Sequence, residues 1–484
     1  MKNFIDVMKE IENTTFTENG GRACKSTGSD LLNLFATIGA LRTRTEFDIC
    51  DMWRKARQEN ETLADNIILY ARDIRNGGLG ERKTARILLK ELARYNPQKI
   101  EKNFDTIVEA GRWDDLFIFL NTKVEDSMLN FIKNQFFKDL TDMQHSKSIS
   151  LLAKWLPSVN ASSRQTKSMA RYICRKWALQ ESTYRKALSK LRRYIKVVEG
   201  KMSAREWNTI DFESVPSLAM LRYNNAFDRN CSGAFAEYKR GLITGEKKIN
   251  ASTLYPYNII QPFLSGTGNI GEIEEAQWKN LPNYINEDMQ VLVVCDTSGS
   301  MYSDYAQPIS TAIGLSIYFA QRNKGAYHNM LMTFSGNPSI IRLSDNASLK
   351  DCIFTAKKGE WGWSTDLDKS FAMIYDIAKV SRDVPQALVI ISDMEINNWD
   401  GSGRYKSITE KWADKFAQIG LKMPKLIYWN VCARNNTFNA TQSDNVAFVS
   451  GSGVGPFKNF IESIEYSAYD SMVKILTQPQ FSWK

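Results

Sequence analysis

The sequence lacks the features that mark membrane, secreted and zinc-binding proteins. No apolar run approaches the roughly 20 residues that a membrane-spanning helix needs, so no membrane span is expected. Residues 1–12 contain acidic side chains and no long apolar core, which argues against a signal peptide. The seven cysteines are scattered singly, with no Cys-x-x-Cys pair. This pattern argues against a zinc site or a disulfide framework and predicts a cytoplasmic protein.

Histidine is almost absent. Only His145 and His328 occur among 484 residues. Histidine is the side chain whose usual pKa best suits acid–base chemistry near neutral pH. Histidine-based catalysis and a histidine-rich metal site are therefore not indicated, and we expect a protein that is not an enzyme.

The C-terminal part has no net positive charge, and the basic excess of the chain lies in the N-terminal part. The net charge is +9, yet residues 286–484 hold 19 Lys and Arg against 20 Asp and Glu. Residues 1–285 hold 44 and 34, so the whole basic excess lies there. An excess of this kind predicts an anionic partner, most commonly nucleic acid, although a solvated cationic surface is the alternative.

The pattern of apolar residues divides the chain into a helical part and an α/β part. Residues 1–29 are polar and are expected to be irregular. Residues 30–244 show helical periodicity in short segments, which predicts a HEAT-like stack of helices. Residues 245–285 are rich in proline and glycine and are interpreted as a connector. Residues 286–484 complete the chain as the predicted α/β domain.

One segment of the helical part, covering two neighbouring predicted helices, is strongly basic. Between Arg164 and Lys201 there are twelve Lys and Arg but only two acidic residues, Glu181 and Glu199. Tyr184, Leu188, Leu191, Ile195 and Val198 recur at helical spacing and are predicted to form the buried stripe of one helix. With the preceding helix, the cations make a candidate phosphate-binding surface, against the alternative of a solvated helix face. The candidate RNA-binding residues are Arg171, Arg175, Lys176, Arg185, Lys186, Lys190, Arg192 and Arg193.

The α/β part alternates predicted strands and helices, which is typical of a doubly wound domain with a mostly parallel sheet. Strands are predicted at Met289–Cys295, Asn329–Phe334, Ser339–Leu343, Ala387–Ser392, Lys425–Asn430 and Asn445–Val449. Helices are predicted at Pro308–Gln321, Leu367–Val380, Thr409–Ile419 and Phe457–Leu476.

A candidate metal site lies where predicted strands end. Asp296-Thr-Ser-Gly-Ser300 follows the first strand and places one carboxylate and two hydroxyls on alternate residues. Hard oxygen ligands of this kind suit Mg²⁺ or another divalent cation. A loop before a predicted helix can add the hydroxyl of Thr365, and Asp393 emerges at the carboxyl end of another strand. The predicted ligands are therefore Asp296, Ser298, Ser300, Thr365 and Asp393.

This set, in order and spacing, resembles the metal-ion-dependent adhesion site (MIDAS) of von Willebrand factor A domains. The resemblance implies that the metal binds a ligand, with an Asp or Glu of a partner, or a phosphate, taking an open coordination position. A metal-bound water could instead serve a hydrolase. Glu395 is then the only nearby candidate for a general base.

The helical part carries a second resemblance. Lys25–Gly28, Tyr70–Arg82, Gly111–Leu116, Lys154–Asn160 and Tyr184–Arg192 occur in that order before the α/β domain. The chain thus resembles TROVE-domain proteins of the Ro autoantigen type, and most closely their uncharacterised relatives grouped as a domain-of-unknown-function family. The resemblance implies a ring of HEAT-like helices closed by the von Willebrand domain. It also implies binding of small structured RNAs and single-stranded RNA ends in a ribonucleoprotein.

Two main hypotheses of function follow. The first is a non-enzymatic RNA-binding ring protein with a divalent-metal site. The second is a metal-dependent protein-interaction or assembly module, including a viral structural module, that does not bind RNA. In the second, an acidic residue of a partner protein occupies the metal site, and the basic helices are dispensable.

Overall fold

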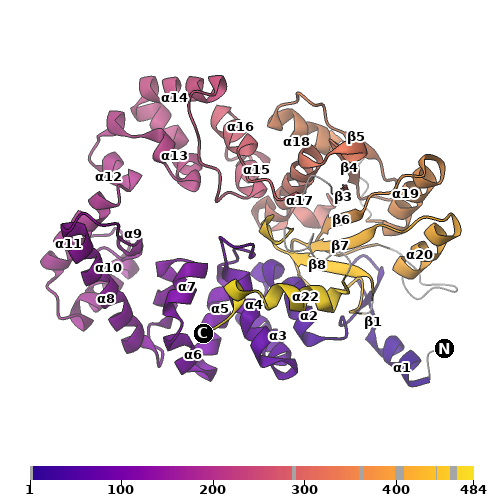
Figure 1. Ribbon diagram of the computed structural model, residues 1–484, viewed down its shortest axis with the longest axis horizontal. Helices are drawn as coiled ribbons and strands as arrows, with labels where there is room; N and C mark the ends of the chain where they lie inside the picture. The colour runs from indigo at the N-terminus through magenta and orange to yellow at the C-terminus, as the bar shows by residue number, and fades with distance from the viewer. Residues whose placement is uncertain (1–3, 286–289, 359–364, 398–407, 443, 458–465) are drawn as a thin grey trace. The chain divides into compact units, whose positions relative to one another are not determined.

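The computed structural model describes residues 4–285, 290–358, 365–397, 408–442, 444–457 and 466–484 (Figure 1). Contacts within the chain define two compact units. Unit 1 contains Met1–Thr84 and Ala251–Ser482, and unit 2 contains Ala85–Asn250 and Trp483–Lys484. These groupings differ from the linear ranges expected from the sequence, because the first helices pack on the α/β domain.

A six-stranded sheet forms the centre of unit 1. Its strand order is β5-β4-β3-β6-β7-β8; all neighbouring pairs are parallel except β4–β5, which is antiparallel. The predicted doubly wound, mostly parallel sheet is confirmed. All six strands occur where expected, and their ends lie within one residue of the predicted ends, except that β3 begins at Val291 whereas its predicted start, Met289, lies outside the described residues. The strands are β3 Val291–Cys295, β4 Met330–Thr333, β5 Ile340–Arg342, β6 Ala387–Ser392, β7 Lys425–Asn430 and β8 Val446–Ser450.

Helices cover both faces of this sheet. Successive residues of a strand point to opposite faces, so neighbouring residues of one strand contact different helices. Trp429 of β7 packs against Phe319 of α17, with ring centroids 5.8 Å apart. Its neighbour Tyr428 faces the opposite side, toward Thr409 of α20. The described α-helices that follow β3 in the chain are α17 Ser303–Arg322, α18 Leu349–Lys358, α19 Leu367–Ser381, α20 Ile408–Gln418 and α22 Ala468–Leu476. Of these, α18 was not predicted.

The first helices of the chain belong to this α/β unit. The backbone N–H of Gly39 donates to the Ser450 hydroxyl at 3.0 Å, and a Cβ at Gly39 would lie 2.6 Å from the Ser450 carbonyl oxygen. Glycine thus permits the close approach of the chain to the end of β8. The helices concerned are α2 Asp30–Thr37, α3 Glu46–Glu59 and α4 Glu61–Arg72, with the 3₁₀ helix Ile38–Thr43 after α2.

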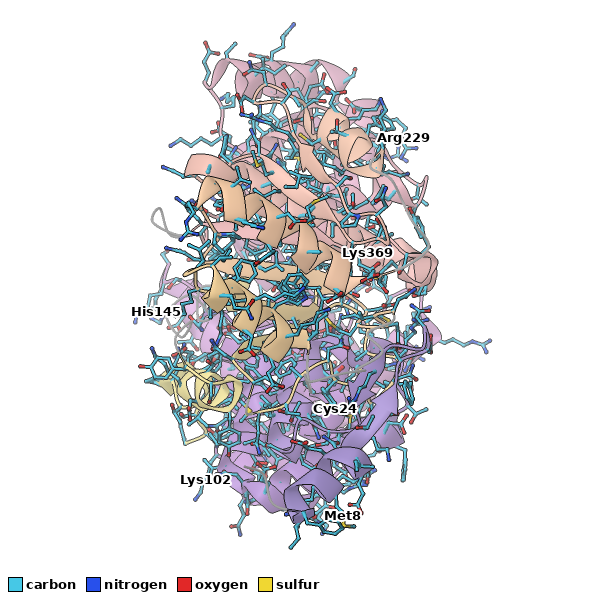
Figure 2. The ribbon with its side chains drawn as sticks, turned by 90° about the vertical axis from the view of Figure 1, so that its right-hand side faces the viewer. Met8, Cys24, Lys102, His145, Arg229 and Lys369 are labelled. Carbon is cyan, nitrogen blue, oxygen red and sulfur yellow. The ribbon has the colours of Figure 1, made fainter. Side chains whose placement is uncertain are left out.

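Two segments expected to be irregular or linking contain regular structure. The N-terminal segment forms α1 Phe4–Asn13 and a short antiparallel pair, β1 Thr14–Phe16 and β2 Arg22–Cys24. Met8 of α1 is 43% exposed and lies at the surface (Figure 2). The connector contains α15 Pro256–Leu264 and α16 Glu272–Lys279, of which α15 packs along α17. The 3₁₀ helices of this unit outside the first segment are Gly299–Tyr302, Gly325–Tyr327 and Pro479–Phe481.

The regular elements in the described residues of unit 2 are all helices, as the periodicity predicted. Its helices are α5 Lys83–Tyr95, α6 Pro97–Glu101, α7 Phe104–Ala110, α8 Glu125–Gln144, α9 Leu152–Trp155, α10 Arg164–Lys176, α11 Glu181–Tyr194, α12 Val198–Ser203, α13 Ser217–Asn230 and α14 Ser232–Thr244. Three 3₁₀ helices lie at Trp113–Phe119, Trp207–Thr209 and Phe212–Ser214. The closed ring implied by the resemblance to Ro proteins stays a prediction. No helix among the described residues is long and apolar enough to cross a membrane.

Candidate metal centre and candidate nucleic-acid interface

The candidate metal centre lies at the carboxyl ends of β3 and β6, which are adjacent parallel strands. Cys295 pairs with Ile391, so Asp296 and Ser392 follow at the same level of the sheet. This edge is where open α/β sheets place their ligands. Both side chains are buried, and Ser392 donates a hydrogen bond of 2.5 Å to Asp296 Oδ2. Pairing of the two strands therefore assembles the site from residues 96 positions apart in the sequence.

The loop after β3 gathers three of the five predicted ligands. The backbone N–H of Ser298 donates to Asp296 Oδ1 at 2.9 Å, and the hydroxyl oxygens of Ser298 and Ser300 are 3.0 Å apart. Adjacent ligands in an octahedron around Mg²⁺, at the usual Mg–O distance, are separated by about 3 Å. The two hydroxyls are hydrogen-bonded to each other, and their spacing also fits adjacent ligands of a magnesium ion. Each carboxylate oxygen of Asp296 retains a lone pair that could bind such an ion.

The two aspartates affect each other electrostatically. Burial, and then the negative charge of Asp393, raise the pKa of Asp296 to about 7. A negative charge beside a buried carboxyl group opposes the ionisation of that group, and a bound cation would reverse this effect. Asp393 is partly compensated by the protein itself, since Arg434 Nη2 lies 2.9 Å from its Oδ2.

Thr365 is hydrogen-bonded to Glu395 and Asn397. Its Oγ1 lies 2.9 Å from the Glu395 carbonyl oxygen and 2.8 Å from Asn397 Oδ1, and it accepts a hydrogen bond from the Asn397 N–H. Thr365 thus contacts the segment that follows Asp393. The two residues before it, Trp363 and Ser364, lie outside the described residues.

Glu395, the candidate general base of the hydrolase alternative, has a structural role. Burial raises its pKa. Its carboxylate accepts the Glu18 backbone N–H at 2.7 Å and the Asn435 side-chain amide at 3.0 Å. Glu395 therefore helps to hold the N-terminal segment against the end of β6. Neither histidine contributes to the site: His145 and His328 contact the Thr141 and Asn323 carbonyl oxygens.

Clusters of three or more His, Cys, Asp or Glu placed to hold a metal ion do not occur among the described residues. The candidate centre has two carboxylates and depends on hydroxyls for further ligands. This donor set, hard and entirely oxygen, fits Mg²⁺ or a similar divalent cation and would suit a soft metal poorly.

Sequence reasoning missed three residues at this site: Ser392, Arg434 and Glu18. Ser392 immediately precedes Asp393, and its place at the end of a strand beside Asp296 was an available signal. Arg434 and Glu18 offered none, because they are distant in sequence from the motif and reach it only through packing.

The candidate nucleic-acid interface lies on α10 and α11 of unit 2. Tyr184, Leu188 and Leu191 are buried, so the predicted stripe is confirmed within α11. The helix ends at Tyr194, however, and Val198 begins α12. Of the five residues expected to form the buried stripe of one helix, three therefore lie on α11.

Three of the eight candidate cations form hydrogen bonds or ion pairs within the protein. Arg192 donates to the Ala153 and Leu156 carbonyl oxygens and to the Ser158 hydroxyl, at 2.7–2.8 Å. Lys176 Nζ lies 2.8 Å from Asp126 and 3.2 Å from Glu125, and Arg171 lies 3.4 Å from Glu181. The acidic partners of Lys176 come from α8, a helix distant in sequence, which is why sequence reasoning did not find them.

The remaining five candidates are exposed: Arg175, Arg185, Lys186, Lys190 and Arg193. Arg175 lies over the Tyr172 ring, with its guanidinium carbon 5.9 Å from the ring centroid. Arg185, Lys186, Lys190 and Arg193 form what we call the α11 cation stripe. Among the described acidic side chains none forms an ion pair with a member of the stripe.

Comparison with known proteins divides the chain between two family models. Residues 114–291 match "Domain of unknown function (DUF2828)", and residues 290–480 match "Domain of unknown function (DUF7788)". "Uncharacterized protein L728" of Acanthamoeba polyphaga mimivirus is 27% identical over 510 residues, which cover 96% of this chain and 88% of the viral protein. Both matched models describe domains of unknown function, and the resemblance to TROVE-domain proteins stays a prediction.

The chain also matches a solved structure, the "Crystal structure of Deinococcus radiodurans RO (RSR) protein". The match has 14% sequence identity and a TM-score of 0.39, and it covers 92% of each chain.

Proposed function

We propose that the protein binds RNA through the α11 cation stripe and Arg175. The observation that supports this most strongly is the separation of charge between the two units. Unit 2 contains 31 Lys and Arg against 18 Asp and Glu, whereas unit 1 contains 32 against 36. The phosphate backbone supplies most of the affinity in such interactions. The compact units thus separate charge more completely than the linear halves of the sequence do.

The stripe occupies the face of α11 opposite to its buried side. With 3.6 residues per turn, Arg185, Lys186, Lys190 and Arg193 fall within about 140° of the helix surface, opposite Tyr184, Leu188 and Leu191. Eight residues separate the first and last members, so the stripe is about 12 Å long. Arg192 falls beside the buried face, which agrees with its internal hydrogen bonds. The proposal therefore no longer includes Arg192 as a ligand of RNA.

Phosphate contacts predict a strong dependence on salt. For single-stranded RNA, each neutralised phosphate contributes about 0.7 to the slope of log affinity against log salt. The test is a mobility-shift titration, at several salt concentrations, with a structured small RNA and a single-stranded RNA. Replacing Arg185, Lys186, Lys190 and Arg193 by Gln should reduce the slope by about 3 and weaken binding at least tenfold.

A matched control removes the same charge elsewhere. Arg342, Lys357, Lys358 and Lys379 are exposed in unit 1. Their replacement by Gln changes net charge equally and should leave RNA binding nearly unchanged. Equal loss in both variants would indicate a general effect of net charge, and no binding by the wild-type protein would refute the proposal.

A second function is favoured by the geometry of Ser298 and Ser300. Their 3.0 Å hydroxyl separation supports a divalent cation held with Asp296 and Asp393, to which an acidic residue of a partner protein binds. Both proposed functions are binding functions without a catalytic step.

Calorimetric titration of the full chain with Mg²⁺ and Mn²⁺ tests the proposed metal site. Binding should disappear in Asp393→Asn and persist in Ser344→Ala, an exposed serine of the same unit. Identical titrations of the wild-type protein and Asp393→Asn would contradict it.

A further inference from the structure

The carboxylate of Asp393 already has a positive charge beside it. Arg434 follows β7 and places Nη2 2.9 Å from Asp393 Oδ2. The Asp393 side chain is 1% exposed and that of Arg434 is 28% exposed. The guanidinium therefore extends from the surface to a buried carboxylate that the proposed metal site also needs.

Arg434 has a second acidic partner in the N-terminal segment. The same Nη2 lies 3.2 Å from Glu18 Oε2, whose side chain is 49% exposed. Arg434 Nε, in contrast, is buried and has no hydrogen-bond partner. A guanidinium pairs best when two of its N–H groups face one carboxylate. One Nη shared between two carboxylates, with Nε unused, is an incomplete arrangement that leaves room for a shift between partners.

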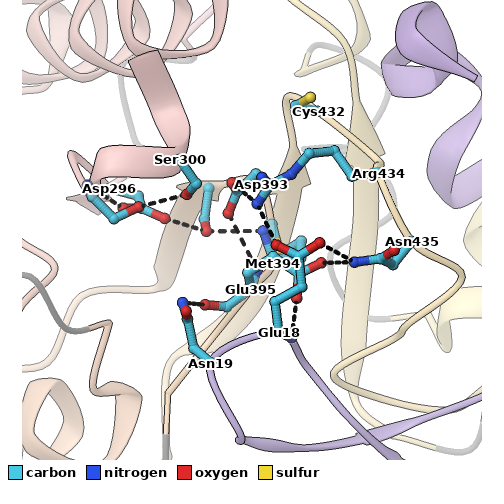
Figure 3. Close-up of polar contacts among 12 residues, drawn as sticks. Glu18, Asn19, Asp296, Ser300, Asp393, Met394, Glu395, Cys432, Arg434 and Asn435 are labelled. Atoms are coloured by element: carbon cyan, nitrogen blue, oxygen red, sulfur yellow. Dashed lines mark hydrogen bonds and ion pairs between the residues drawn. The ribbon is translucent and has the colours of Figure 1, made fainter. Parts of the chain in front are cut away.

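The loop that carries Glu18 is held firmly against the end of β6 (Figure 3). Thr17 donates its hydroxyl proton to the Ile396 carbonyl oxygen at 2.7 Å, and the Asn19 amide donates to the Glu395 carbonyl oxygen at 2.6 Å. Asn435 Nδ2 contacts Glu18 Oε1 at 2.8 Å, from the residue next to Arg434. Glu18 is therefore positioned beside Arg434 by several independent contacts.

We propose that Arg434 is an internal counter-charge that competes with the divalent cation for Asp393, and that Glu18 sets the strength of this competition. The inference rests on the proposed metal site and deepens it by naming its regulation. A cation close to Asp393 is repelled by the guanidinium and must share or replace its contact. Glu18 offsets the charge of Arg434 and offers it an alternative partner. The N-terminal segment thereby influences metal affinity without supplying a ligand.

The test is calorimetric titration with Mn²⁺ of the full chain and four variants. Arg434→Gln should bind Mn²⁺ at least tenfold more tightly than wild type, because the repelling charge is gone. Arg434→Lys, which keeps the charge, should stay closer to wild type. Glu18→Gln should bind several-fold more weakly, because nothing then offsets Arg434. The double variant Arg434→Gln/Glu18→Gln should resemble Arg434→Gln, since Glu18 acts through Arg434.

The outcomes separate this inference from the metal site itself. Mn²⁺ binding of equal or lower affinity in Arg434→Gln would overturn the competition while leaving the metal site standing. Binding by Arg434→Gln but not by wild type would support the competition and would contradict metal binding by the native chain. If no variant binds Mn²⁺, both proposals fail. Arg342→Gln, exposed on β5, controls for net charge, and thermal unfolding verifies that each variant is folded.

Discussion

Ser392 donates a hydrogen bond of 2.5 Å to Asp296, and this bond joins the ends of the two central strands of the sheet. It brings the loop after β3 together with the loop that contains Asp393. Asp296 is consequently buried beside a second carboxylate, and its pKa rises to about 7. A site that raises the pKa of an acid in this way is poised for a cation, because a divalent ion would stabilise both ionised carboxylates.

Asp296→Asn should stabilise the protein in the presence of a chelator. A carboxyl group whose pKa is raised on folding contributes stability that is present below about pH 4 and lost as pH rises through about 7. The advantage of the variant should therefore grow between about pH 4 and pH 7, by up to about 4 kcal/mol. Saturating Mg²⁺ should raise the Tm of the wild type and leave that of Asp296→Asn unchanged. Thermal unfolding at several pH values, with chelator or Mg²⁺, measures both effects.

Replacing Arg192 or Arg193 by Ala should have different effects on stability and on RNA binding, although the two residues are neighbours. Arg192→Ala leaves two carbonyl oxygens and a hydroxyl without their charged donor and should cost about 2–3 kcal/mol of unfolding free energy. Arg193 is exposed, so Arg193→Ala should change stability by less than about 0.5 kcal/mol. It should weaken RNA binding instead. Urea unfolding and a mobility-shift titration of the two variants check this; similar stability losses would refute the assignment.

Gly21→Ala should detach the N-terminal loop from the α/β domain. A Cβ at this position would lie 2.2 Å from the Ile396 carbonyl oxygen, so the backbone must move. We expect faster proteolysis and faster hydrogen exchange within residues 14–24. Gly233→Ala is the control, because nothing lies within 4 Å of its added Cβ; as a position inside α14 it should gain up to about 1 kcal/mol. Unchanged protection of residues 14–24 in Gly21→Ala would count against the packing described.

Lys425 should make stability depend on pH in the alkaline range. Burial, and then the charge of Lys422, lower the pKa of Lys425 to about 8. The folded state therefore holds fewer protons than the unfolded state between about pH 8 and 10.5, and stability rises with pH there. Relative to Lys425→Met, the wild type should gain about 1–3 kcal/mol across this range. Urea unfolding at pH 8, 9 and 10 measures the difference, with exposed Lys379→Met as the control.

Local patterns determined much of this protein. Continuous apolar runs such as Val291–Cys295 specified buried parallel strands, and the spacing of Asp296, Ser298 and Ser300 specified a loop of oxygen ligands. The apolar spacing of α11 also specified its buried residues Tyr184, Leu188 and Leu191. Periodicity within one element carries this information, because strand and helix geometry fix which side chains share a face.

Only the tertiary structure decided which residues act together across the chain. It placed α2–α4 on the sheet unit, gave Arg192 and Lys176 internal partners, and brought Glu18 and Arg434 to Asp393. Glu18 and Arg434 are more than 400 residues apart in sequence. Such contacts depend on how packed elements meet, and no local periodicity records them. The sequence therefore determined the elements and the central ligand motif, whereas packing determined the charges that surround it.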